Sequence, residues 1–123
     1  MSYLDHFSAD RASRVYVQVL EQLKVKKLYR ERGITARQIA EIIDEDPRAI
    51  SAALAIETGD NFFALINQLR VREACRLLRD PKFAEWSAEE IGLRSGFSSR
   101  QSFYTAFNLY VGVTPKKYRK QEE

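Results

Sequence analysis

Apolar residues recur along most of this chain at the three- and four-residue spacing of amphipathic helices. Runs that alternate between apolar and polar residues, as half-buried strands do, are nearly absent. The first apolar stripe with helical spacing predicts a helix that Ser8 or Asp10 can cap. Its members are Ala12, Val15, Tyr16, Val19, Leu20 and Leu23. The pattern as a whole predicts an all-α fold.

Residues 34–59 carry the signals of two short helices joined by a tight turn. Thr35 with Gln38 forms a capping box, and Asp46 followed by Pro47 marks the start of the second helix, which Gly59 ends. Two helices separated by three or four residues form a helix-turn-helix unit. Residues 60–80 then predict one long helix, because Pro81 prevents its continuation.

Residues 81–120 repeat the helix-turn-helix pattern. Ser87 with Glu90 is a second capping box, Gly96 ends that helix, and Ser99 can cap the next, which carries Phe103 and Phe107 on its inward face. A last helical turn follows from Thr114 and Pro115. We therefore expect one domain over 34–120, with two helix-turn-helix subdomains joined by a long central helix, preceded by an N-terminal helix and connector over 1–33.

The net charge of +3 conceals an uneven distribution. Residues 1–33 hold seven Lys or Arg against four acids, 34–59 hold two against five, and 60–120 hold eleven against six. A polyanion should therefore meet the C-terminal half first. Solvated helix faces explain the charge alone equally well.

Candidate chemistry of other kinds is sparse. The single cysteine cannot form an internal disulfide, and the single histidine, His6, has no partner in the sequence and is expected at the surface. The acids of 44–46 lack calcium-loop spacing, and the adjacent Glu89 and Glu90 do not face each other on a helix. No run approaches the roughly 18 apolar residues of a membrane span. We expect a cytoplasmic domain with no catalytic residues, metal, cofactor or membrane contact.

The outer face of the last long helix is polar. Its exposed positions are predicted to be Arg100, Gln101, Tyr104, Thr105 and Asn108. A helix with an aromatic inner face and a polar outer face suits the major groove of DNA, although an ordinary surface helix has the same pattern. The duplicated helix-turn-helix unit favours DNA.

Several segments together resemble the DNA-binding domain of the AraC/XylS family of bacterial transcription regulators. They are Ile39-Ala40, Ile66 to Val71 with Ala74 and Leu77-Leu78, Gly96 to Ser99 with Phe103 and Phe107, and Gly112 to Pro115 with Tyr118-Arg119. The resemblance covers about residues 34–120 and is weaker over 3–33. It implies two reading helices presented to successive segments of the major groove of double-stranded DNA.

The resemblance also implies which residues meet DNA. The base-reading positions are Arg48, Ser51 and Ala52 in the first unit and Arg100, Gln101, Tyr104 and Thr105 in the second. Residues expected to position the phosphates are Arg70, Ser98, Ser99, Asn108, Lys116 and Lys117.

The first unit departs from the family pattern. Ala52, Ala55 and Ile56 stand where the family has polar or basic side chains, and Gly92 in the second unit stands where the family has alanine. We therefore expect the second unit to carry most of the sequence preference. The alternative is a protein-interaction module that contacts RNA polymerase or a sister domain through a degenerate first unit. We also expect a sensor domain in a longer parent chain.

Overall fold

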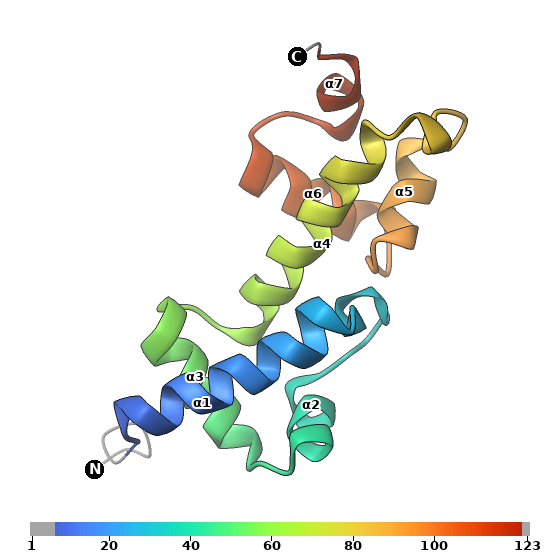
Figure 1. Ribbon diagram of the computed structural model, residues 1–123. Coiled ribbons are helices and arrows are strands. Elements are labelled where there is room, and N and C mark those ends of the chain that lie inside the picture. Colours follow the sequence, from blue (N-terminus) through green and yellow to red (C-terminus); the bar gives the residue numbers. More distant parts are fainter. Residues whose placement is uncertain (1–6, 122–123) are drawn as a thin grey trace. The chain divides into compact units, whose positions relative to one another are not determined.

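The computed structural model describes residues 7–121, and every regular element in that range is helical (Figure 1). His6, expected at the surface, lies outside the described residues. The α-helices are α1 Ala9–Leu20, α2 Ala36–Ile43, α3 Pro47–Thr58, α4 Phe62–Leu78, α5 Ala88–Arg94, α6 Arg100–Val111 and α7 Pro115–Lys120. The predicted all-α fold class is confirmed.

The helices begin where the predicted capping residues stand. Both capping boxes are present, from Thr35 to Gln38 before α2 and from Ser87 to Glu90 before α5. Ser99 accepts the backbone N–H of Ser102 and starts α6. Each bond satisfies an N–H group that the helix itself leaves without a partner.

Three short elements differ from the predicted pattern, which continued the first helix to Leu23 and assigned no 3₁₀ turns. The end of α1 continues as a π-helical turn over Glu21–Val25, and two 3₁₀ turns cover Leu28–Arg30 and Pro81–Phe83. Lys27, just before the first 3₁₀ turn, has a φ of +61°.

The described residues form two compact units. The first contains the residues up to Leu28 together with Gly33–Ile66, and the second contains Tyr29–Arg32 together with Asn67 onward. The N-terminal helix α1 is therefore part of the first unit, whereas four residues of the connector belong to the second.

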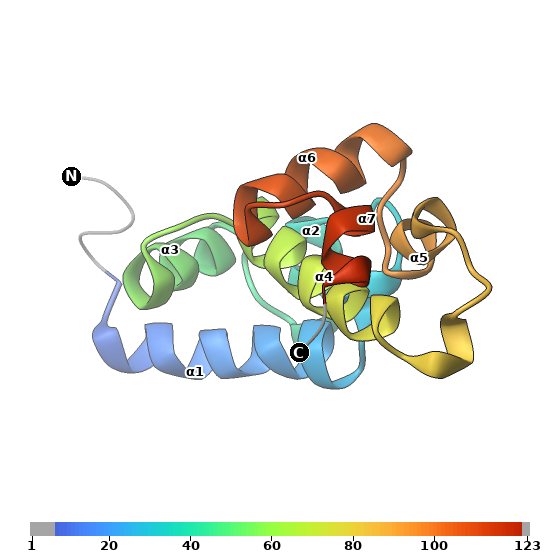
Figure 2. The same cartoon turned by 90° about the horizontal axis from the view of Figure 1, so that it is seen from above.

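In the first unit, α1 packs chiefly against α3, and α2 packs against α3 as well (Figures 1 and 2). The fully buried aliphatic side chains come from all three helices and from the π-helical turn after α1, and include Val15, Val19, Leu23, Ile39, Ile50 and Leu54. Because two helices cover α3, the chain buries five of its positions, three of them alanines.

The core of the second unit is aromatic. The rings of Phe97 and Phe107 lie 5.2 and 5.7 Å, centroid to centroid, from that of Phe103, and Tyr118 of α7 packs on Phe107 at 5.6 Å. These contacts hold α6 and α7 and the turn before α6 to one core, which also contains Leu77 and Ile91.

The connector residues are anchored to α4. Tyr29 donates its hydroxyl to Glu73 at 2.9 Å, and Arg70 donates to the backbone carbonyls of Tyr29 at 2.7 Å and Glu31 at 3.0 Å. Gly96 lies so close to the connector backbone that a Cβ atom at this position would be 2.4 Å from the Tyr29 carbonyl oxygen. With a φ of +114°, only glycine suits this position.

Candidate nucleic-acid interface

The helix α6 has one anchored face and one exposed face. Phe103 and Phe107 are at most 1% exposed, so the helix is fixed against the core along the side that the sequence predicted. The opposite side exposes Arg100, Gln101, Thr105 and Asn108. All four carry hydrogen-bonding groups of the kinds that bind base edges or phosphates.

An open hollow of about 460 Å³ lies along one side of α6. Five of its seven lining residues have polar side chains, and the lining includes Asn67, Ser99, Gln101, Ser102, Thr105 and Leu109. Two predicted base-reading residues, Gln101 and Thr105, therefore share one recess, which broadens the polar surface beyond a single row of side chains.

Arg100 and Tyr104 meet a carboxylate that the sequence did not assign to the interface. Tyr104 donates its hydroxyl to Glu89 Oε2 at 2.6 Å, and Arg100 Nε lies 3.3 Å from the same oxygen. The Arg100 guanidinium also lies over the Tyr104 ring, 5.0 Å from its centroid. The hydrogen bond from Tyr104 lowers the pKa of Glu89, and the ion pair with Arg100 acts in the same direction. We call Glu89, Arg100 and Tyr104 the acid–arginine cluster.

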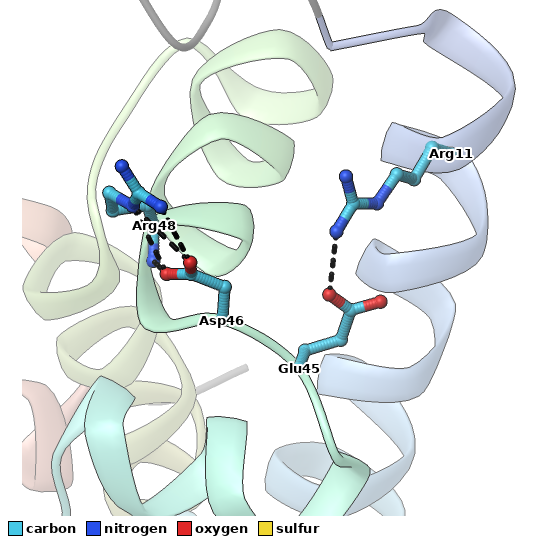
Figure 3. A network of polar contacts seen from close by, with 4 residues as sticks. All are labelled: Arg11, Glu45, Asp46 and Arg48. Atoms are coloured by element: carbon cyan, nitrogen blue, oxygen red, sulfur yellow. Dashed lines mark hydrogen bonds and ion pairs between the residues drawn. The ribbon is translucent and has the colours of Figure 1, made fainter.

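In the first unit, the predicted reading residue Arg48 is exposed at the start of α3. Its side chain pairs with Asp46, the N-cap residue of the same helix, with 2.8 Å between Nη2 and Oδ2 (Figure 3). Hydrogen bonds from the Arg48 side chain and backbone lower the pKa of Asp46 to about 2. The acids of 44–46 thus include a helix cap, as the sequence suggested.

A second ion pair joins α1 to the turn before α3. Arg11 lies 2.8 Å from Glu45 (Figure 3), and this contact crosses between segments 34 residues apart in the chain. Glu45 is therefore a tertiary contact within the first unit. Its charge nevertheless stays beside Asp46, near the start of α3.

Ala52 does not occupy the reading surface that the family resemblance implied. It is 6% exposed and belongs to the core of the first unit, because α1 and α2 both pack on α3. Ala52, which the resemblance aligned with a reading position of the family, is therefore not available at the surface of α3. Ser51, the neighbouring predicted reader, is exposed.

Two arginines of the second unit have structural partners. The guanidinium of Arg70 is held by the two connector carbonyls, and burial lowers its pKa. Arg119 donates to the carbonyls of Leu78, Phe83 and Trp86 and so holds the loop before α5. We do not carry Arg70 into the proposed phosphate contacts.

The other predicted phosphate-contacting residues lie at the surface. Ser98, Ser99, Asn108, Lys116 and Lys117 are exposed, although the Ser99 hydroxyl also serves as the cap of α6. Lys116 and Lys117 stand in the first turn of α7, whose start Thr114 caps. These positions remain predictions for DNA contact.

Within residues 7–121, no group of three or more His, Cys, Asp or Glu side chains is arranged to hold a metal ion. In the same range, no single helix is long and apolar enough to cross a membrane, whereas α3 and α4 taken together across their bend meet that criterion on length and composition.

Comparison with known sequences finds transcription regulators. A family model described as "Helix-turn-helix domain" matches residues 39–121. An uncharacterized HTH-type transcriptional regulator of Mycobacterium tuberculosis is 31% identical over 97 residues, which are 77% of this chain and 27% of that protein. The melibiose operon regulatory protein of Escherichia coli is 38% identical over 55 residues, 45% of this chain and 17% of that protein. The chain thus spans about a quarter of the length of its mycobacterial relative.

Two solved structures are similar over most of the chain. The C-terminal domain of AraT, a response regulator from Geobacillus stearothermophilus, has a TM-score of 0.70 at 29% identity and covers 98% of this chain and 89% of its own. The C-terminal domain of the two-component response regulator yesN from Fusobacterium nucleatum has a TM-score of 0.71 at 27% identity, covering 85% and 99%.

Proposed function

Because this chain belongs to the AraC/XylS family of helix-turn-helix transcription regulators, we propose that it binds double-stranded DNA sequence-specifically and reads the major groove chiefly with α6. Membership of the family supports DNA-binding regulation in general. The assignment of the main reader to α6 rests on this chain's own residues.

The observation that carries the proposal is the contrast between the two faces of α6. Phe103 and Phe107 fix the helix to the core, while Arg100, Gln101, Thr105 and Asn108 stand exposed on a helix of 12 residues. An α-helix with such an outer face fits the width of the major groove.

The exposed side chains suggest distinct partners. Arginine presents two N–H groups that match the O6 and N7 acceptors of guanine, and glutamine pairs in the same way with adenine N6 and N7. We assign Arg100 and Gln101 to these contacts, and Thr105 to a contact with a base edge or a thymine methyl. Lys116 and Lys117 supply charge for the phosphates.

Selection of bound sequences from a random duplex pool tests the proposal. We expect an enriched site whose information is concentrated mainly in one major-groove segment. Two segments of equal information content would overturn the assignment of α6 as chief reader. Binding that falls with salt and shows no sequence preference would overturn sequence-specific recognition itself.

A further inference from the structure

We propose that Glu89 of α5 is a positioning residue for Arg100 and a determinant of DNA specificity, so that binding to unmatched DNA is penalised while one guanine contact is favoured. The inference rests on the proposed function. It concerns a residue outside the reading helix that neither the sequence nor the family resemblance pointed to.

The geometry of the acid–arginine cluster restrains Arg100 from two sides. Glu89 Oε2 lies 3.3 Å from its Nε atom, and the ring of Tyr104 lies under its guanidinium. Tyr104 is itself held, because its hydroxyl bonds the same carboxylate oxygen and its ring packs on Phe103 with 5.6 Å between centroids. The buried core thus orients Tyr104, and Tyr104 and Glu89 together orient Arg100.

The guanidinium atom that Glu89 contacts determines which nitrogens of Arg100 remain available to a base. Glu89 meets Nε, and the two terminal nitrogens of the guanidinium form another edge of the planar group. These two nitrogens can meet the two acceptors of a guanine while Nε keeps its carboxylate. An arginine already held in this direction loses less conformational freedom when it binds.

The negative charge of Glu89 lowers the affinity for duplex DNA in general. A carboxylate beside the reading helix repels the phosphates of any duplex, whatever its sequence. Where no guanine meets Arg100, no contact offsets this repulsion. This repulsion is common to all duplexes and lowers their affinities alike, whereas the orientation of Arg100 favours only the matched guanine and so raises the ratio of matched to unmatched affinity.

The same cluster should matter little for folding. The side chains of Glu89 and Arg100 are 32% and 66% exposed, and ion pairs this accessible stabilise folded proteins only weakly. The capping box of α5 uses Ser87 and Glu90, so replacing Glu89 leaves the cap in place. Binding can therefore be measured on folded variants.

The experiment compares Glu89→Gln with Glu85→Gln, a charge-matched control at an exposed acid just before α5. Affinities are measured for the site that the wild-type chain selects and for random duplex. We expect Glu89→Gln to raise random-duplex affinity about two- to fivefold, the range that one surface charge pair supplies, and to lower the ratio of selected to random affinity. Glu85→Gln should leave that ratio unchanged. An unchanged ratio in Glu89→Gln overturns the proposal.

Repeating the selection in an Arg100→Ala background tests whether Glu89 acts through Arg100. With Arg100 present, Glu89→Gln should broaden the preference at one guanine position. Without Arg100, it should change no position. A wild-type chain that selects no sequence overturns the proposed function and this inference together, whereas a selected site whose profile Glu89→Gln leaves intact overturns the inference alone.

Discussion

The helices α3 and α6 occupy the same place in their two helix-turn-helix units, and each presents an arginine paired with an acid near its start. In α3, Arg48 is paired with the N-cap residue of its own helix, two positions earlier. In α6, Arg100 is paired with Glu89 from the preceding helix. The first pair is local, whereas the second exists only because α5 and α6 pack together.

The two helices also differ in the residues that they bury. Two helices cover α3, which buries Ala49, Ala52 and Ala53 in addition to its large apolar residues. In contrast, α6 buries only Phe103, Ala106 and Phe107. Large aromatic rings anchor α6 on one side, so three buried residues suffice to hold it, and its other residues are exposed or partly exposed.

A helix-turn-helix pattern does not by itself establish a reading surface. The extra helix α1 turns part of α3 into core and places Arg11 against Glu45, beside the start of α3. The exposed residues of α3 include Ala55, Ile56 and Glu57, and residues 34–59 carry two basic residues against five acids. We therefore expect it to contribute little base discrimination.

Phe107→Ala should have the largest effect, because it removes a fully buried ring that packs against Phe103 of α6 and Tyr118 of α7. We expect a loss of about 3–5 kcal/mol in the free energy of unfolding. Hydrogen exchange should show lost protection in α5 and α6 and retained protection in α1 and α3. Leu109→Ala, at an exposed position of the same helix, is the control and should change stability by less than about 0.5 kcal/mol. Equal loss of protection in both units would show that they do not unfold separately.

Arg100→Ala and Arg48→Ala compare the contributions of α6 and α3 to DNA affinity and base preference. We expect Arg100→Ala to weaken binding to the selected site by about 1–3 kcal/mol and to relax the preference at one base pair. Arg48→Ala should cost less and leave the base profile nearly unchanged. Binding to random duplex is measured in parallel. An equal loss on selected and random DNA would assign Arg100 to the phosphate backbone, and a larger loss for Arg48→Ala would reverse the comparison.

Gly92→Ala tests how tightly α5 meets the aromatic face of α6. A Cβ atom at this position would lie 2.4 Å from the Phe103 ring, which is buried and has little room to shift. Overpacking should exceed the roughly 1 kcal/mol gain in helix propensity and leave a net destabilisation of about 1–2 kcal/mol. In a Phe103→Leu background the same substitution should cost less, as thermal unfolding can show. Additive effects of the two substitutions would argue against the clash.

The smallest expected effect concerns the local ion pair between Arg48 and Asp46 in the first unit. The carboxyl of Asp46 should titrate near pH 2 by NMR, well below the ordinary value of 3.8. Because its folded-state pKa is depressed, its contribution to stability is fully present above the unfolded-state pKa and is lost as the pH falls through about 2. The contribution of Asp46 to the free energy of unfolding should therefore stay constant between pH 5 and 8. Arg48→Ala should raise the Asp46 pKa, and a wild-type midpoint near 3.8 would show that the pair does not persist in solution.

Much of the local structure could be predicted because its causes lie within a few residues. The capping boxes at Thr35 and Ser87 bond only three positions ahead, and Asp46 with Pro47 starts α3 as expected. The aromatic spacing at Phe103 and Phe107 also identified the inward face of α6. The π-helical turn at Glu21–Val25 and the two 3₁₀ turns had no comparable signal, because polar, apolar and turn residues there fit several conformations.

By itself, the sequence determined the all-α class, the two helix-turn-helix units and the anchored and exposed faces of α6, because helix periodicity and capping act over one or two turns. Only the tertiary structure decided that Ala52 is core, that Arg70 holds the connector and that Glu89 faces Arg100. Each of these depends on which segments meet, such as α1 on α3 or Tyr29 beside Gly96. A charged residue has the same local pattern whether it faces solvent, a carbonyl or another side chain, so its partner is fixed only when distant segments pack.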